Sequence, residues 1–88
     1  MIRLSDMLLI QAKSYMSATT KDWISKAERD FGTARREFDV ADCPNPDAVC
    51  FHSQQCIEKL MKALIVQANV TPPFTHDLGI LSRILSTH

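Results

Sequence analysis

One stretch in the middle of this 88-residue chain constrains its fold more than any other feature. Asn45 is a favoured helix N-cap, and Pro46 fits the first position of the helix that follows it. Asn69 is suited to end a helix, and the prolines at positions 72 and 73 prevent its continuation. The sequence therefore predicts one helix from Pro46 to about Ala68, about 34 Å in length.

This helix carries apolar residues over more than half of its circumference. A helix of this kind packs against several neighbours, so we expect it to be the central helix of the fold. One face is formed by Val49, Cys56, Ile57, Leu60, Ala63 and Leu64, and it is widened by Cys50, Met61, Ile65 and Ala68. The remaining strip is polar and carries His52, Gln55, Glu58, Lys59 and Lys62.

A second apolar stripe follows Thr20, which we expect to be an N-cap. Trp23, Ala27, Phe31, Ala34 and Phe38 fall within about 80° of arc on a helix. Asp30 lies at the edge of this stripe. An unpaired buried carboxylate is costly or becomes protonated, so Asp30 needs a partner, and His52 and Lys59 are the candidates.

Two further segments have helical spacing. Residues 2–16 predict an N-terminal helix, or an arm that orders only on docking. Thr75 predicts the N-cap of a last short helix with Leu78, Leu81, Ile84 and Leu85 as its stripe. We expect an all-α, up-and-down bundle of about four helices. A chain this short buries a small core, so oligomerisation is expected to complete it.

Composition excludes several classes of protein. Ten basic residues balance ten acidic ones, which argues against a dedicated polyanion binder. The apolar runs are far shorter than the roughly 20 residues that a membrane span needs, so we expect no membrane association and a cytoplasmic location. Cys43, Cys50 and Cys56 are odd in number and lack C-x-x-C spacing, so we expect reduced, mostly buried thiols. His52 and Cys56 share a helix face, but Cys50 projects about 120° from Cys56, so three metal ligands do not converge and we expect no metal. We also expect no cofactor.

Three motifs occur in order along the chain. They are W-x3-A-x2-D-x3-A from Trp23, F-H-x-Q-Q-x-x-E-K-x-x-K-A-L from Phe51, and P-x-T-H-D-L from Pro73. Together they resemble the HEPN family of small prokaryotic helical proteins, over about residues 23–85. On this basis we divide the chain into an extra N-terminal helix or arm, residues 1–19, and a C-terminally truncated HEPN-like domain, residues 20–88.

The resemblance implies a helical bundle that is usually homodimeric and is often encoded beside a minimal nucleotidyltransferase. Some members are the ribonuclease of a toxin–antitoxin pair, and others bind nucleotide or RNA or act as scaffolds. We therefore expect an interaction module that forms a dimer or higher homo-oligomer. It would be the partner subunit of a nucleotidyltransferase, or would bind nucleotide or RNA. The alternative is a ribonuclease toxin.

The resemblance also implies where catalysis would lie. Ribonuclease members use an R-x4–6-H motif in a helix beyond the T-H-D-L segment, and that motif is not found at this place. Arg83 and His88 do match R-x4-H, but in a different helix and about 140° apart if that helix is continuous. We therefore assign no catalytic residue, and only the ribonuclease alternative would use Arg83 and His88.

A set of polar residues forms the candidate network or ligand site. Asp30 with His52 or Lys59 favours a buried polar network over an acid–base pair, because no nucleophile accompanies them. The polar strip predicts either a solvated face or a groove for nucleotide phosphates. The residues alone leave His76 unassigned, and the resemblance implies that it could face a dimer interface or a ligand. The full candidate set is Asp30, His52, Gln55, Lys59, Lys62 and His76.

Overall fold

The computed structural model of the chain describes residues 16–40 and 42–88. These residues form three helices, α2 (Ala18–Phe38), α3 (Pro46–Gln67) and α4 (Leu78–Ser86), joined by loops without strands. The predicted all-α class is confirmed. The helix predicted at the N-terminus lies outside the described residues except for its last position, Met16.

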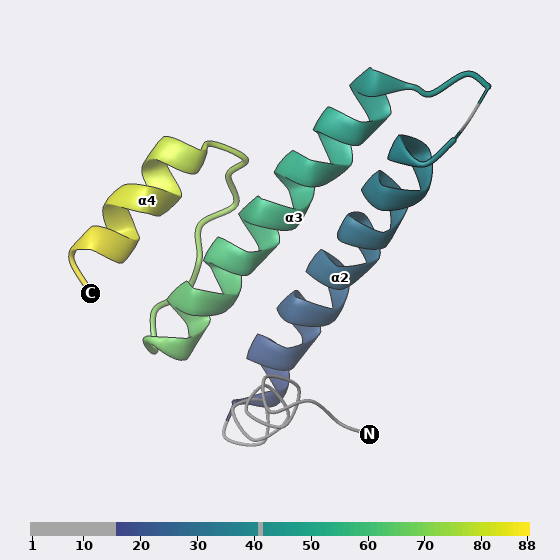
Figure 1. Cartoon of the computed structure of the whole chain (residues 1–88). Helices are drawn as coiled ribbons and strands as arrows, with labels where there is room; N and C mark the ends of the chain where they lie inside the picture. The colour runs from purple at the N-terminus through teal and green to yellow at the C-terminus, as the bar shows by residue number, and fades with distance from the viewer. Residues whose placement is uncertain (1–15, 41) are drawn as a thin grey trace.

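The long helix α3 lies between its two neighbours. Figure 1 shows α2 running antiparallel beside α3 for most of its length, and the shorter α4 on the opposite flank of α3. Both α2 and α4 pack on α3. The arrangement is the one expected of a central helix with a wide apolar arc. No described helix is long and apolar enough to cross a membrane.

The ends of α3 follow from its local sequence. Asn45 Oδ1 accepts a hydrogen bond from the Ala48 N–H at 3.1 Å, and Pro46 occupies the first turn. At the other end, Asn69 has a φ of 62°, in the left-handed region where Asn is tolerated. The predicted bounds of this helix are therefore confirmed to within a residue.

Two predicted caps are wrong, and for the same reason. Ser17, not Thr20, caps α2, because the Ser17 hydroxyl accepts a hydrogen bond from the Thr20 N–H at 3.1 Å. Asp77, not Thr75, caps α4 by accepting from the Gly79 N–H at 2.8 Å. In each place two capping side chains stand two or three residues apart, and the structure uses the stronger N-cap type, Ser or Asp, and not Thr.

The apolar core of the described residues is small. Its fully buried apolar members are three alanines and two larger residues: Ala27, Ala34, Ala63, Ile65 and Leu81. The expected α2 stripe is therefore only partly internal, because Phe31 and Phe38 are exposed. Alanines at the helix contact bring the two axes close together, and the bulky side chains beside them are left at the margins.

The cysteines are also less buried than expected. Cys43 and Cys50 are exposed free thiols, and Cys56 is partly buried. Cys43 lies in the loop before α3, and Cys50 lies on the apolar side of α3 that no described element covers. The prediction of mostly buried thiols is wrong, because two of the three cysteines are exposed in the structure.

Candidate functional site

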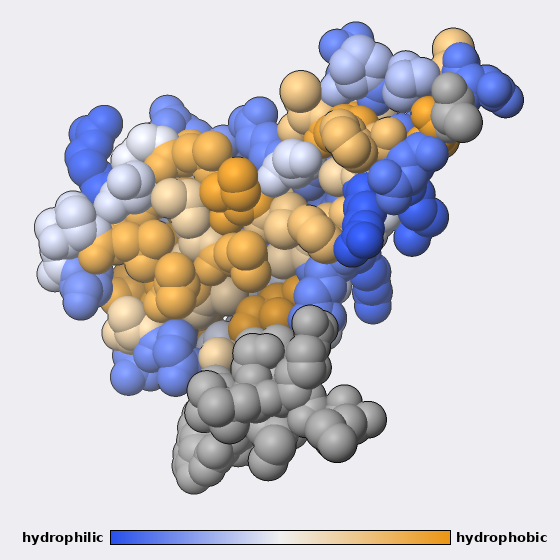
Figure 2. Space-filling model, viewed as in Figure 1, coloured by the Kyte–Doolittle hydropathy of each residue, from blue (hydrophilic) through white to orange (hydrophobic). Residues whose placement is uncertain are grey.

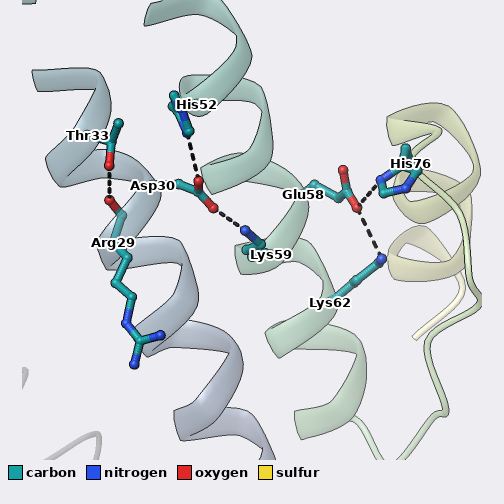
Figure 3. A network of polar contacts seen from close by, with 8 residues as sticks. All are labelled: Arg29, Asp30, Thr33, His52, Glu58, Lys59, Lys62 and His76. Atoms are coloured by element: carbon teal, nitrogen blue, oxygen red, sulfur yellow. Dashed lines mark hydrogen bonds and ion pairs between the residues drawn. The ribbon is translucent and has the colours of Figure 1, made fainter. Parts of the chain in front are cut away.

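A polar cluster joins α2 to α3. Figure 3 shows Asp30 of α2 pointing between His52 and Lys59 of α3. His52 Nδ1–H donates to Asp30 Oδ1 at 3.0 Å, and Lys59 Nζ donates to Asp30 Oδ2. The structure thus brings Asp30 together with both of its candidate partners. Each carboxylate oxygen accepts one hydrogen bond, and the Asp30 side chain is only 13% exposed.

The charge of Asp30 is stabilised by these partners. Burial alone would raise the pKa of the Asp30 carboxyl, but the hydrogen bonds and charges of Lys59 and His52 outweigh it and hold that pKa below its ordinary value. Burial, together with the charge of Asp30, raises the pKa of the nearby Cys56 thiol. The cluster therefore favours an ionised carboxylate and a protonated thiol. This is the chemistry of a structural ion pair and not of an activated nucleophile.

A second cluster lies on the other flank of α3. Glu58 Oε1 accepts from Lys62 Nζ at 3.1 Å and from His76 Nδ1–H at 2.8 Å (Figure 3). Glu58 is 2% exposed and Lys62 is 7% exposed, whereas the His76 side chain is 80% exposed. The other carboxylate oxygen of Glu58 is buried without a hydrogen-bond partner among the described residues.

Lys62 also reaches α2. Its Nζ lies 5.3 Å from the centroid of the Trp23 ring, at cation–π distance, and Lys26 of α2 lies 5.0 Å from the same ring. Lys62 therefore contacts α2 through Trp23 and the segment before α4 through Glu58 and His76. These polar interactions link the three described helices, whose apolar core contains few large buried side chains.

The remaining candidate residues are not brought into these clusters. Gln55 is partly buried on α3, and no side-chain hydrogen bond of Gln55 is found in the described part of the chain. Arg83 lies exposed on α4, and His88 follows the Thr87 C-cap, also exposed. Within residues 16–40 and 42–88, no three His, Cys, Asp or Glu side chains are placed to hold a metal ion.

Sequence reasoning missed the importance of Glu58. Its place in the polar strip predicted a solvated or ligand-facing side chain, yet it is among the most buried residues of the described chain. The signal in the sequence was its spacing of four residues from Lys62, a pairing that lets two charged groups neutralise each other on one helix face. That spacing is common on solvated helices, so it does not by itself indicate burial.

Part of the apolar side of α3, in contrast, is exposed to solvent. Ile57, Leu60 and Leu64 lie within about 60° of arc on the helix and are 49%, 43% and 59% exposed. We call these three residues the open face. Figure 2 shows apolar side chains gathered over the middle of the visible side of the molecule, with hydrophilic ones toward its edges. Charged residues of α3 are thus buried inside the chain, while large aliphatic ones face outward.

An apolar groove borders the open face. It lies between the start of α2 and the second half of α3, and its volume is about 260 Å³. Met16 and Ile24 line one side, and Leu60, Ala63 and Leu64 line the other. We call it the α2–α3 groove. Its few polar atoms are already engaged, since Thr20 Oγ1 donates to Gln67 Oε1 at 3.2 Å.

Comparison with known proteins gives one match. The family model described as the HEPN domain matches residues 20–88, which include all three helices apart from the first two residues of α2. No curated protein and no solved structure matches the chain.

Proposed function

Because the chain belongs to the HEPN domain family, we propose that it is a helical interaction module that assembles through the open face of α3. The observation that carries this proposal is the reversed burial along α3. Glu58 and Lys62 are buried within the chain, whereas Ile57, Leu60 and Leu64 are exposed. Exposed aliphatic residues gathered on one helix face mark an interaction surface.

The size of the core supports a second copy of the chain as the first partner. Only Ile65 and Leu81 are large apolar residues that are fully buried in the described chain. Oligomerisation is one of the ways in which small domains without disulfides gain the missing burial. Two open faces packed together would bury the exposed half of six large side chains, each worth about half of the roughly 1.5–3 kcal/mol that complete burial contributes. We therefore propose a homo-oligomer, with a dimer as its simplest form.

A protein partner is favoured over a phosphate-bearing ligand. Lys59 and Lys62, the cations of the polar strip, are engaged by Asp30 and Glu58 within one chain. A phosphate would have to displace a carboxylate from each of them. As the family resemblance implies, we propose that the assembled module pairs with a nucleotidyltransferase subunit. Binding of nucleotide or RNA has no comparable support from these lysines.

The ribonuclease alternative has no support from the geometry. Arg83 and His88 are both exposed, and α4 ends at Ser86 between them, so no single helix presents the pair. The described residues also hold no cluster in which a base activates a nucleophile. The predicted role of Arg83 and His88 therefore stays a prediction that belongs to this alternative.

A charge placed on the open face tests the proposal. Ile57→Asp adds a carboxylate where the second copy would pack and leaves the α2–α3 groove intact. Ser25→Asp is the matched control, because Ser25 is exposed on α2 and faces away from α3. In light scattering at tens of micromolar, we expect the wild type and Ser25→Asp to be oligomeric and Ile57→Asp to be monomeric with unchanged helicity. A monomeric wild type, or an oligomeric Ile57→Asp, would overturn the proposal.

A further inference from the structure

Phe74 is the most exposed large apolar side chain of the described residues. Its relative exposure is 109%, so none of residues 16–40 and 42–88 covers the ring. The other exposed phenylalanines of the described residues are less exposed, the next being Phe38 at 72%. We propose that Phe74 is an anchor that inserts into the α2–α3 groove of a second copy of the chain. This inference rests on the proposed self-assembly and names the contact that fixes its geometry.

The segment that carries Phe74 is tied down on both sides. Pro73 precedes it with a fixed φ. The Thr75 N–H donates to the Pro73 carbonyl at 3.0 Å, and this hydrogen bond closes a backbone turn with Phe74 at its centre. His76 is held to the buried Glu58 carboxylate at 2.8 Å. A side chain presented on a constrained turn loses little conformational freedom on binding, and this favours its use as an anchor.

The α2–α3 groove has the size and chemistry that an aromatic ring needs. A cavity of about 150 Å³ lined by aliphatic and aromatic side chains accommodates benzene, and the groove is about 260 Å³ in volume. Its walls are the aliphatic side chains of Ile24, Leu60 and Leu64. The hydrogen bond between Thr20 and Gln67 satisfies the polar groups at its end, so the groove does not require a polar ligand.

A second copy is the occupant that these two features favour. The described residues leave a ring uncovered and an apolar groove unfilled, so one two-fold axis would satisfy both features twice. Leu60 and Leu64 belong both to the groove and to the open face, so the anchor would be continuous with the proposed interface. Aromatic anchors in desolvated pockets contribute most of the affinity in many interfaces.

Photo-crosslinking from position 74 tests where the ring goes. Phe74 is replaced by p-benzoylphenylalanine in full-length chain labelled with ¹⁵N, mixed with unlabelled chain, irradiated and mapped by mass spectrometry. We expect crosslinks between labelled and unlabelled chains at Ile24, Leu60 or Leu64. Thr71, exposed in the same loop, carries the photoprobe as a control and should give few crosslinks in the groove. Crosslinks from position 74 confined to its own chain, or to other regions of the second copy, would overturn the inference.

The dimerisation affinity of Phe74 variants tests the anchor separately from self-assembly. Phe74→Ala should weaken dimerisation about a hundredfold, since each of two rings is expected to contribute about tenfold, while Thr71→Ala should change it less than about twofold. If the wild type assembles and Phe74→Ala assembles equally well, the anchor is wrong and the proposed function stands. If the wild type is monomeric at every concentration, both are wrong.

Discussion

Lys62 Nζ lies 3.1 Å from Glu58 Oε1 on the same flank of α3, and both side chains are removed from water. An ion pair four residues apart on a solvated helix contributes only a few tenths of a kcal/mol. Here the pair is buried, and Lys62 also lies over the Trp23 ring of α2. Removal of one partner therefore leaves a buried charge and disrupts the packing between helices.

Loss of the Lys62 charge should destabilise the fold strongly. Lys62→Met keeps an unbranched side chain of similar length but leaves the Glu58 carboxylate buried with only His76 beside it. We expect the free energy of unfolding to fall by about 3 kcal/mol in urea titrations. The double variant Glu58→Met, Lys62→Met should recover most of that loss, because neither charge is then buried alone.

Lys26→Met is the matched control for this prediction. Lys26 lies over the same Trp23 ring as Lys62 but is exposed, so we expect a change within about 0.5 kcal/mol. Equal losses for Lys26→Met and Lys62→Met would show that the Trp23 contact, and not the buried ion pair, is what matters.

The Asp30 cluster should make stability depend on acid pH. Burial opposes ionisation, but Lys59 and His52 hold the pKa of Asp30 below its ordinary value, which is also its value in the unfolded chain. The stabilisation is therefore present above about pH 4 and is lost as the pH falls through the folded-state pKa. We expect Asp30→Asn to lose about 2 kcal/mol at pH 7, and its difference from the wild type to shrink progressively as the pH falls below about 4.

Urea titrations at several pH values check this prediction. Asp39→Asn is the control, because Asp39 pairs with Arg35 at 3.9 Å on the exposed end of α2 and is expected to contribute less than about 0.5 kcal/mol. A difference between wild type and Asp30→Asn that stays constant from pH 7 to pH 3 would contradict the assigned ionisation of Asp30.

The cysteines should differ in reactivity. Burial and the nearby Asp30 charge raise the pKa of the Cys56 thiol, so less of the reactive thiolate forms. Cys43 is exposed in the loop before α3. We expect iodoacetamide to modify Cys43 at least about tenfold faster than Cys56, measured by peptide mass spectrometry on dilute protein. In denaturing urea the two rates should converge, and equal rates in the native chain would contradict the burial of Cys56.

The helices of the described chain were largely predictable from sequence, and the side on which α3 meets water was not. Asn45, Pro46 and Asn69 mark the ends of α3 through local backbone chemistry, which acts in the same way in any tertiary context. The burial of Glu58 and Lys62 depends on Trp23 and His76, which are distant in the sequence. Hydropathy therefore predicted an apolar arc that a second copy would help to cover, but it did not predict the burial of Glu58 and Lys62.

One cluster of the candidate site could be predicted from sequence and the other could not. Asp30 could be predicted to need a partner because its carboxylate lies at the edge of an apolar stripe, and His52 and Lys59 were the available groups. The second cluster could not be predicted, because Glu58 and His76 meet only through the path of the loop before α4. The Ser17 cap could have been predicted from residue type, because serine ranks above threonine as an N-cap.

Solvent exposure of the open face, measured at different protein concentrations, most directly tests whether a second copy of the chain packs on it. Methyl groups of Ile57, Leu60 and Leu64 can be followed by NMR with a soluble paramagnetic agent, with the buried methyls of Ile65 and Leu81 as internal references. We predict strong relaxation enhancement of the open-face methyls in dilute protein and a clear fall as the concentration rises. Enhancement that stays constant across the dilution series, whether strong or weak, would contradict assembly of a second copy on this face.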